Sequence, residues 1–370
     1  MAILYSNNIT DQQKNDIQQL FQQFSHPTLQ KDLIALNAVK KIEKGGETLR
    51  VELQIPFAWN TAFEQLKSTL SEPLLKAAEA KNIKWQLNYQ IATLKRANSH
   101  PAVKGVKNII AVTSGKGGVG KSTVTVNLAL ALQAQGARVG ILDADIYGPS
   151  VPHMLGAADQ RPTSPDNKHI SPIIAHGLNA NSIGFLMEAD NATIWRGPMA
   201  SSALSQLLNE TLWNELDYLV IDMPPGTGDI QLTLSQQIPV TGAVVVTTPQ
   251  DIALIDAIKG VAMFNKVSVP VLGIIENMSM HICSNCGHHE TIFGIGGAQK
   301  IAEKYDVQVL GQLPLHIRLR EDLDNGTPTV IAEPNGEITQ SFLKLAEKVA
   351  AELYWQGSVI PGEIMFREVK

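Results

Sequence analysis

A glycine-rich segment at residues 115–123 constrains the fold of this chain more than any other feature. Its sequence, GKGGVGKST, fits the pattern G-x-x-x-x-G-K-[ST], and it lies between the apolar run Ile109–Val112 and a helical pattern over 121–135. Glycines let backbone N–H groups wrap around phosphate groups, and the N-terminus of the following helix adds partial positive charge. The segment therefore predicts a phosphate-binding loop between a buried strand and a helix.

The residues of this loop have distinct expected roles. The ammonium of Lys121 should reach the β- and γ-phosphates of a nucleotide, and the hydroxyl of Ser122 should bind Mg²⁺. A second lysine, Lys116, follows the first glycine, and an ordinary phosphate loop does not require it. The residues expected to bind nucleotide are Gly115, Gly117, Gly118, Val119, Gly120, Lys121, Ser122 and Thr123.

The chain beyond residue 108 has the pattern of a parallel sheet built around this loop. Short apolar runs recur, as expected for parallel strands buried on both faces; they are Ile109–Val112, Val139–Leu142, Tyr218–Ile221, Ala243–Val246 and Val271–Ile275. Helical patterns alternate with them, for example over 121–135, 252–265 and 338–356. This alternation predicts an α/β fold over 108–370, with a doubly wound, mostly parallel sheet of the P-loop NTPase kind. A hairpin or loop is expected at 157–180.

Residues 1–95 have a different pattern, which predicts a small α+β domain. Two stretches with a period of two, 49–55 and 85–91, indicate half-buried strands. Helices are expected in three places, namely around 17–24 after a cap at Asp11, over 60–80, and near Thr28. Residues 96–107 are basic and polar and contain proline and glycine, so we expect them to form a linker.

Acidic residues follow two of the apolar runs, at the sheet edge where parallel α/β folds bind ligands. Asp145 is the candidate for orienting or deprotonating an attacking water, and Asp143 is expected to support it or the Mg²⁺ shell. Asp222 ends the run DYLVID and fits the Walker B pattern, in which a carboxylate holds Mg²⁺. The segment Pro224–Asp229 then lies where a switch should sense the γ-phosphate.

Both cysteines of the 370-residue chain, Cys283 and Cys286, lie in one C-x-x-C motif. Two thiols exclude a disulfide scaffold, and a tetrahedral Zn²⁺ or a [4Fe–4S] cluster needs about four ligands. Three arrangements remain open. Two chains can share one metal centre across a dimer axis, a histidine among His281, His288 and His289 can complete a zinc site, or the pair can act as a redox dithiol.

The loop KGGVGK, with its extra lysine, resembles the deviant phosphate loop of the MinD/ParA class of P-loop ATPases. In that class the lysine reaches the nucleotide of the partner subunit, so the resemblance implies an ATP-sandwich homodimer with Lys116 acting across the interface. The amide of Asn277, after the run VLGIIE, is expected to read adenine, as in the related ATPases, and Pro314 is expected to flank the base. The expected catalytic residues are Lys116, Lys121, Asp145 and Asp143.

Several ordered motifs are similar to those of the Mrp-type iron–sulfur cluster carrier ATPases within this class. They are GVKNIIAVTSGKGGVGKST, DADIYGPSVPHMLG, WRGPM at 195–199, DYLVIDMPPGTGD and ENMS-x-x-x-C-x-x-C. The resemblance covers 104–330. It implies a homodimer that binds ATP and Mg²⁺, carries a bridging [4Fe–4S] cluster on Cys283 and Cys286, and delivers it to apo-proteins. Residues 1–95 resemble a divergent domain of the MIP18 type without a cysteine.

Two other interpretations share these motifs. A positioning ATPase of the MinD/ParA kind has the same loop and dimer, and an ATPase with a structural zinc across the dimer would use the same thiols. The membrane-binding members usually carry a basic amphipathic terminal helix, whereas the last residues here, QGSVIPGEIMFREVK, are mixed in charge. These residues therefore favour the carrier interpretation.

The charge and hydropathy of the chain limit the kinds of partner that we expect it to bind. Lys and Arg number 30 against 35 Asp and Glu, a net charge of −5, so nucleic acid is not an expected partner. The chain shows no signal peptide and no run of about 18 apolar residues, so we expect a cytoplasmic protein that does not bind a membrane. The expected partners are a second copy of the chain, iron–sulfur apo-proteins and cluster-assembly scaffold proteins.

Overall fold

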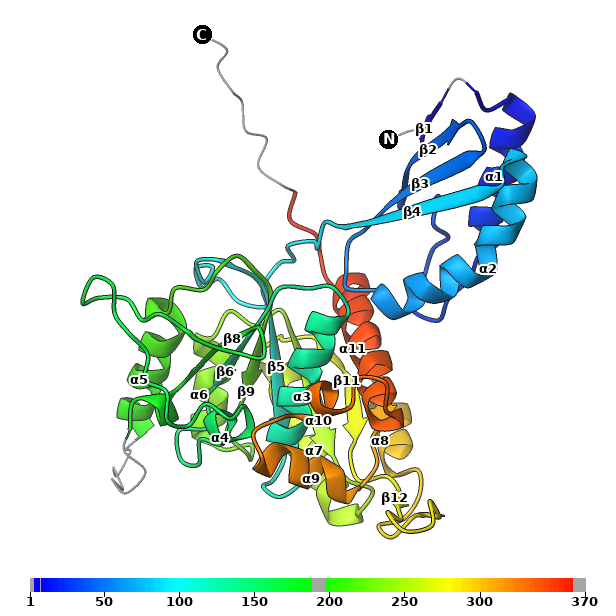
Figure 1. Ribbon diagram of the computed structural model, residues 1–370. Helices are drawn as coiled ribbons and strands as arrows, with labels where there is room; N and C mark the ends of the chain where they lie inside the picture. The colour runs from blue at the N-terminus through cyan, green and yellow to red at the C-terminus, as the bar shows by residue number, and fades with distance from the viewer. Residues whose placement is uncertain (1–2, 7, 188–196, 362–370) are drawn as a thin grey trace.

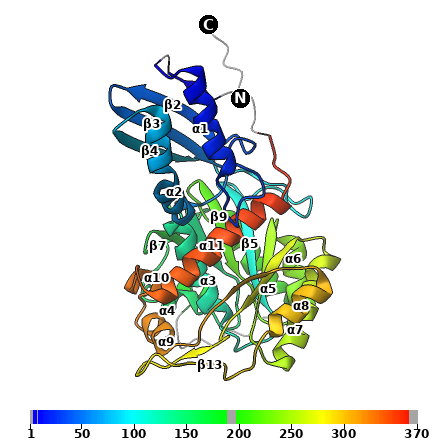
Figure 2. The same ribbon diagram turned by 90° about the vertical axis from the view of Figure 1, so that its right-hand side faces the viewer.

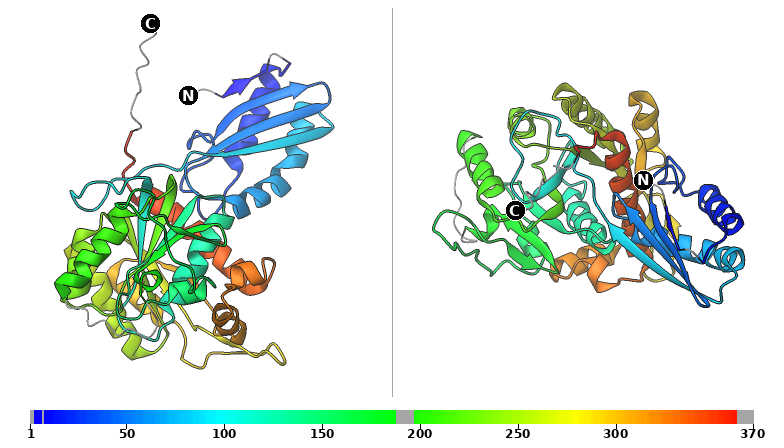
Figure 3. Two further views of the ribbon diagram at one scale, coloured as in Figure 1. Left: turned by 60° about the vertical axis from the view of Figure 1, so that its left-hand side comes forward. Right: turned by 90° about the horizontal axis from the view of Figure 1, so that it is seen from above.

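The structure is a computed structural model that describes residues 3–6, 8–187 and 197–361. A four-stranded sheet with two helices is formed by the N-terminal part of the chain, and a larger sheet with helices on both faces is formed by the rest (Figure 1). The N-terminal part packs at one end of the larger part (Figure 3).

The N-terminal sheet has the strand order β1-β2-β3-β4. Strands β1 and β2, and β3 and β4, are parallel, while β2 and β3 are antiparallel. Both helices of this part lie on the same face of the sheet (Figure 1). The elements are β1 (Leu4–Tyr5), α1 (Asp11–Gln23), β2 (Val39–Gly45), β3 (Thr48–Ile55), α2 (Asn60–Ala78) and β4 (Asn82–Tyr89). The predicted strands over 49–55 and 85–91 and the helix over 60–80 are confirmed.

Two local predictions in this part need correction. Helix α1 is capped by Thr10, whose hydroxyl accepts a hydrogen bond from the N–H of Gln13, and Asp11 is its first residue. The short helix expected near Thr28 is wrong, because residues 26–37 form turns. The carboxylate of Asp32 accepts the N–H groups of two nearby residues, and such side-chain bonds compete with helix formation.

The larger sheet has the strand order β14-β11-β10-β5-β9-β6-β8-β7. Every neighbouring pair is parallel except β7 and β8, which form a hairpin that begins inside the region 157–180 and ends two residues beyond it. The predicted doubly wound, mostly parallel sheet is therefore confirmed. Its strands are β5 (Val106–Ser114), β6 (Val139–Asp143), β7 (Ile173–Ala175), β8 (Leu178–Ser182), β9 (Leu216–Asp222), β10 (Gly242–Thr247), β11 (Val271–Glu276) and β14 (Val309–Gln312).

Alternate residues of these strands enter two separate hydrophobic cores. In β5, for example, Ile110 and Val112 pack on one side of the sheet, and Ile109 and Ala111 pack on the other. The first side is covered by α3 (Lys121–Ala134), α10 (Thr329–Ala332) and α11 (Glu337–Gln356). The second side is covered by α5 (Gly197–Glu210), α6 (Asp229–Gln237), α7 (Asp251–Lys266) and α8 (Gly297–Tyr305). Figure 2 shows α11 and α3 side by side.

The N-terminal part is attached to the end of α3 by side chains and backbone groups. Gln135, which caps α3 and is fully buried, accepts hydrogen bonds from the N–H groups of Trp59 and Asn60 and exchanges two side-chain bonds with Thr61. The amide of Asn60 also donates to the carbonyl of Ala134 at 2.9 Å. The last carbonyl groups of a helix have no partner within the helix, and here residues 59 and 60 satisfy those of Ala134 and Gln135.

The segment 96–105 between the two parts has no regular structure, and β5 begins at Val106, inside the stretch expected to be a linker. This segment is bonded to the larger part. Ala97 donates its N–H to Val240, and the amide of Asn98 donates to the carbonyls of Gln236 and Ile238.

Candidate functional site

The glycine-rich loop connects the carboxyl end of β5 to the first residue of α3. It borders a cavity of about 230 Å³ that lies at the N-terminus of that helix. Gly118 and Gly120 both have positive φ angles, of 83° and 79°, which a glycine adopts without strain. The cavity is lined by Ser114, Lys116, Gly117, Gly118, Gly120, Lys121, Ser122, Thr123, Asp145, Met154 and Pro225. Backbone N–H groups, two lysines and a helix N-terminus thus meet at one place suited to phosphate groups.

A buried network joins the loop to the end of β9. The Nζ atom of Lys121 lies 2.6 Å from Oδ1 of Asp222, and the hydroxyl of Ser122 donates to Oδ2 at 2.6 Å. The hydroxyl of Thr125 also donates to Oδ1, at 2.8 Å. Thr125 is absent from the sequence-based assignments, although it lies one helical turn after Lys121 and so faces the same way.

The two aspartates after β6 occupy different places. Asp143 is fully buried and accepts hydrogen bonds from the N–H groups of Asp145 and Val151 and from the hydroxyl of Ser182. Burial, and then the charge of Asp222, raise the pKa of Asp143 to about 7. It is not among the residues that line the phosphate cavity, so its contacts are those of a group that orders the loop after β6.

Asp145, in contrast, is half-buried in the wall of the phosphate cavity. Burial raises the pKa of this carboxyl, while the nearby charge of Lys121 acts in the opposite direction. A carboxylate at this place can accept a proton from a water molecule in the cavity.

A second cavity of about 180 Å³ adjoins the first and shares Gly120, Thr123 and Met154 with it. Asn277 and Pro314 both line it, together with Met278, Leu315, His316, Leu319, Arg320, Leu323 and Asp324. An apolar wall with a few polar groups suits a purine base. The side-chain nitrogen of Asn277 already donates to the carbonyl of Val119 at 2.9 Å.

The predicted switch segment begins at the end of β9 beside the phosphate loop. Pro225 lines the phosphate cavity, and Gly226, with a φ of 103°, donates its N–H to the carbonyl of Ser114 at 3.0 Å. The segment is therefore bonded to the strand that leads into the loop. The side chain of Asp229, at the end of the predicted switch, lies outside the described residues, as do Trp195 and Arg196 of the WRGPM motif.

The two cysteines lie in a small hairpin formed by β12 (His281–Ile282) and β13 (His289–Glu290). Cys283 is half-buried, Cys286 is exposed, and both are free thiols. Hydrogen bonds from the backbone N–H groups of Cys286 and Asn285 lower the pKa of the Cys283 thiol, which favours the thiolate that binds metals. Within the described part of the chain, no three His, Cys, Asp or Glu side chains are grouped to hold a metal ion.

Comparison with known proteins assigns the chain to a family. The family described as "ParA: NUBPL iron-transfer P-loop NTPase" matches residues 105–350. The chain belongs to this family. The match includes the phosphate loop, the end of β9 and the cysteine hairpin of this NUBPL-type NTPase.

Named relatives of this NUBPL-type NTPase match over most of their length. The iron–sulfur cluster carrier protein of Haemophilus influenzae is 78% identical over 370 residues, which is 100% of both chains. The protein of the same name from Escherichia coli K12 is 68% identical over 346 residues, 94% of each chain. The mouse iron–sulfur cluster transfer protein NUBPL is 48% identical over 281 residues, 75% of this chain and 87% of the relative.

Among solved structures, a nucleotide-binding protein from Archaeoglobus fulgidus in complex with ADP matches with a TM-score of 0.56 and 37% identity, covering 65% of this chain and 93% of that chain. That structure is also described as containing cobalt. This chain therefore resembles a solved nucleotide-binding protein in fold as well as in sequence.

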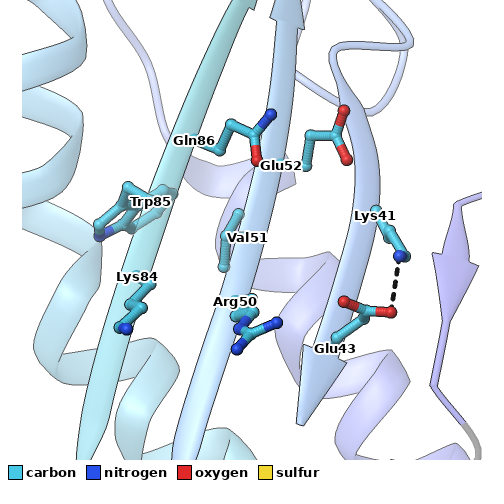
Figure 4. A pocket seen from close by; sticks show the side chains of 8 residues that line it. All are labelled: Lys41, Glu43, Arg50, Val51, Glu52, Lys84, Trp85 and Gln86. Carbon is cyan, nitrogen blue, oxygen red and sulfur yellow. Dashed lines mark ion pairs between the residues drawn. The ribbon is translucent and has the colours of Figure 1, made fainter. Parts of the chain in front are cut away.

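A further hollow of about 400 Å³ lies on the outer face of the N-terminal sheet and shares no lining residue with the other two cavities (Figure 4). Charged side chains of β2, β3 and β4 line it, and two of them, Lys41 and Glu43, form an ion pair at 2.6 Å. Glu52 accepts a hydrogen bond from Asn88. This hollow has no glycine-rich loop and no helix N-terminus among its lining residues, in contrast to the phosphate cavity.

Of the helices described, none has the length and apolar character needed to cross a membrane.

Proposed function

We propose that this NUBPL-type NTPase hydrolyses ATP and carries a [4Fe–4S] cluster between the two subunits of a homodimer, from which it delivers the cluster to iron–sulfur apo-proteins. One observation supports this most strongly. An accessible C-x-x-C hairpin follows β11 at the same edge of the sheet where the phosphate loop follows β5. The cluster would be received from cluster-assembly scaffold proteins in the cytoplasm.

The cluster is cargo here, and two chains are needed to hold it. A [4Fe–4S] cluster takes about four thiolates, and each chain supplies Cys283 and Cys286 alone. Exposed isoleucines lie on the first turns of α7 and on the segment between the hairpin and α8, namely Ile252, Ile255, Ile292 and Ile295. Exposed apolar side chains at neighbouring places favour a surface that another subunit covers.

Lys116 supports the same dimer. Its side chain lines the phosphate cavity, and the described residues supply no ion pair or hydrogen bond to its ammonium. An ammonium without a partner among the described residues is available to reach the phosphates of the other subunit and stabilise charge as hydrolysis proceeds.

The hydroxyl of Ser122 and the carboxylate of Asp222 are hard oxygen donors that fit Mg²⁺. Mg²⁺ held there would neutralise charge on the β- and γ-phosphates of ATP. When ATP binds, the ammonium of Lys121 leaves the carboxylate of Asp222 and binds the phosphates. The carboxylate of Asp145 orients the attacking water and accepts its proton. The segment after Pro224 moves toward the γ-phosphate, and hydrolysis then loosens the dimer and changes access to the cluster.

Metal analysis after anaerobic reconstitution tests the cargo. A brown protein with about four irons per dimer supports the proposal, since that is the content of one cluster. A colourless protein with zinc would overturn it. Either Cys283→Ser or Cys286→Ser should abolish the cluster and leave ATP binding by each subunit unchanged.

The variant Lys121→Ala tests the link to ATP. We expect it to lose ATP binding and the nucleotide dependence of cluster delivery to an apo-protein, while its thiols still accept iron and sulfide. Unchanged delivery, with the same response to ATP, would contradict the coupling.

A further inference from the structure

The loop that carries the cysteine hairpin is pinned at both ends by one carboxylate. Glu276, the last residue of β11, is 1% exposed. Its Oε2 atom accepts the N–H of Ala298 in the first turn of α8 at 2.7 Å, and its Oε1 atom accepts the amide of Gln312 at 2.8 Å. A buried carboxylate is stable only with such donors, and a helix N-terminus is a favourable one. Glu276 therefore holds both ends of the segment 277–297, because it precedes residue 277 in the chain and its carboxylate binds Ala298.

The next residue, Asn277, contacts the phosphate loop directly. It is 4% exposed, donates its side-chain N–H to the carbonyl of Val119 at 2.9 Å, and donates its backbone N–H to Thr247. The carbonyl of Val119 and the N–H of Gly120 belong to one peptide group, and Gly120 lines the phosphate cavity. A Cβ atom on Gly120 would lie 2.4 Å from the amide nitrogen of Asn277, so the two segments are in close contact.

From Asn277 a series of hydrogen bonds leads to the first cysteine. Ser279 donates its N–H and its hydroxyl to the carbonyl of Leu313, at 3.0 and 3.1 Å. Leu315 donates to Met280 at 2.7 Å, and Ile282 donates to Leu315 at 3.2 Å. Cys283 follows immediately. The six residues 277–282 therefore connect the phosphate-loop contact to Cys283, and three of them, Ser279, Met280 and Ile282, are bonded to Leu313 and Leu315.

The segments 277–282 and 313–315, which are hydrogen-bonded to each other, both line the cavity suited to a base. Asn277 and Met278 come from the hairpin side, and Pro314 and Leu315 come from the segment that holds it. A nucleotide with its base in this cavity and its phosphates at Gly120 would touch both segments. If the nucleotide changes the distance between these two segments, the hairpin should move as well, because the hydrogen bonds of Ser279 and Leu315 join the segments just before the hairpin begins.

We propose that the segment Glu276–Ile282 couples nucleotide occupancy to the accessibility of Cys283 and Cys286, with Glu276 as a positioning residue. This inference rests on the proposed carrier function for its purpose, but its test requires only nucleotide and the two thiols. A failure here is therefore distinguishable from a failure to bind iron and sulfide.

The test uses the full-length, cluster-free protein and the rate at which iodoacetamide alkylates its thiols, with and without Mg-ATP or Mg-ADP. The chain has two cysteines, so every alkylation event reports on the hairpin. We expect nucleotide to change the rate of the wild-type protein about five-fold or more, which is the lower end of the usual coupling between two sites. An unchanged rate at saturating nucleotide would overturn the proposal.

The variant Glu276→Gln separates coupling from binding. Glutamine has the same shape as glutamate, but one of its two end groups is an NH₂ that cannot accept a hydrogen bond. One of the two bonds that Glu276 makes to Ala298 and Gln312 is therefore lost. We expect the nucleotide-dependent rate ratio to fall close to one while the Kd for nucleotide changes by less than about two-fold. The matched control is Glu290→Gln, because Glu290 lies on β13 of the same hairpin and is exposed. This control should retain the wild-type ratio.

Two further measurements keep the result interpretable. Ser279→Ala removes only the hydroxyl bond to Leu313 and should lower the ratio partially, which covers the case in which Glu276→Gln folds poorly. Light scattering should show that the variants dimerise with ATP as the wild type does. If the ratio falls only where dimerisation is lost, subunit contact protects the thiols and the proposal is wrong.

Discussion

Lys121 and Asp222 form a buried ion pair, with 2.6 Å between Nζ and Oδ1 and side-chain exposures of 6% and 0%. The same carboxylate accepts the hydroxyls of Ser122 and Thr125. Asp222 therefore holds the groups that we expect to bind ATP and Mg²⁺, and under the proposed function these groups exchange partners when the nucleotide enters.

Replacing Asp222 with asparagine should destabilise the protein and change its metal dependence. Lys121 would keep a buried charge without its partner, which costs about 3 kcal/mol or more in free energy of unfolding. Urea unfolding measures this loss, and nucleotide titrations with Mg²⁺ or with a chelator should become equal in affinity. Glu72→Gln, which removes an exposed carboxylate on α2, is the control and should behave as the wild type. A variant of wild-type stability would contradict the role of the pair.

Lys116 should matter for hydrolysis and not for binding. Lys116→Ala leaves the contacts of Lys121 and Ser122 intact, so the Kd for ATP should change little. The rate of ATP hydrolysis should fall by about 10³-fold or to the background, which is the lower end of the effect of an arginine finger. Lys104→Ala, at an exposed position before β5, serves as the control. Equal losses in both variants would show that the effect comes from net charge.

The Cys283 thiol should ionise at a lower pH than an ordinary cysteine. Backbone N–H groups of Cys286 and Asn285 stabilise its thiolate, so the pKa of Cys283 is lowered from the ordinary value of 9.0. In the Cys286→Ser variant, Cys283 is the single thiol, and its alkylation rate against pH should have a midpoint below 9.0. Glutathione measured under the same conditions gives the reference. A midpoint at or above that of glutathione would contradict the hydrogen bonding described for the hairpin.

Stability should fall as the pH rises from 4.5 to about 7 because of Glu347. This carboxyl of α11 is buried against the N-terminal part, 3.4 Å from the ring of His26 and bonded to the hydroxyl of Thr28. Burial raises the pKa of Glu347 from 4.5 to about 7. The folded protein therefore holds a proton that the unfolded chain has lost, and its stability decreases between pH 4.5 and about 7.

The variant Glu347→Gln measures this effect, because its stability should exceed that of the wild type above pH 7 and the difference should shrink toward pH 5. Burial lowers the pKa of His26, which makes stability fall at low pH, but this group is present in both proteins. Glu352→Gln, on the same helix and more exposed, should leave the pH profile unchanged. Melting temperatures from pH 5 to 8.5 provide the comparison.

Features carried by local patterns could be predicted from the sequence. The phosphate loop, the buried strands and the acidic strand ends each depend on residues close together in the chain, and β5, α3 and β9 lie where expected. The cavity contacts of Asn277 and Pro314 also agree with the predicted placement, although their role in reading a base stays a prediction.

What could not be predicted depends on contacts between distant segments. Thr28 lies in a turn because Trp59, 31 residues away, donates to its hydroxyl at 2.8 Å. Glu276 reads as the last residue of a strand, and its two partners become visible only when α8 and β14 pack beside it. The separate roles of Asp143 and Asp145 follow from the direction of each side chain after β6, which spacing alone does not define.

The hydrogen bonds of residues 59–61 to the end of α3 have a mechanical consequence. This helix has 14 residues and is therefore about 21 Å long, with the phosphate loop at its first turn and the N-terminal part at its last. One continuous helix therefore links residues 59–61 to the phosphate loop. A displacement of residues 59–61 would reach the loop through this helix and not through the segment 96–105, which has no regular structure.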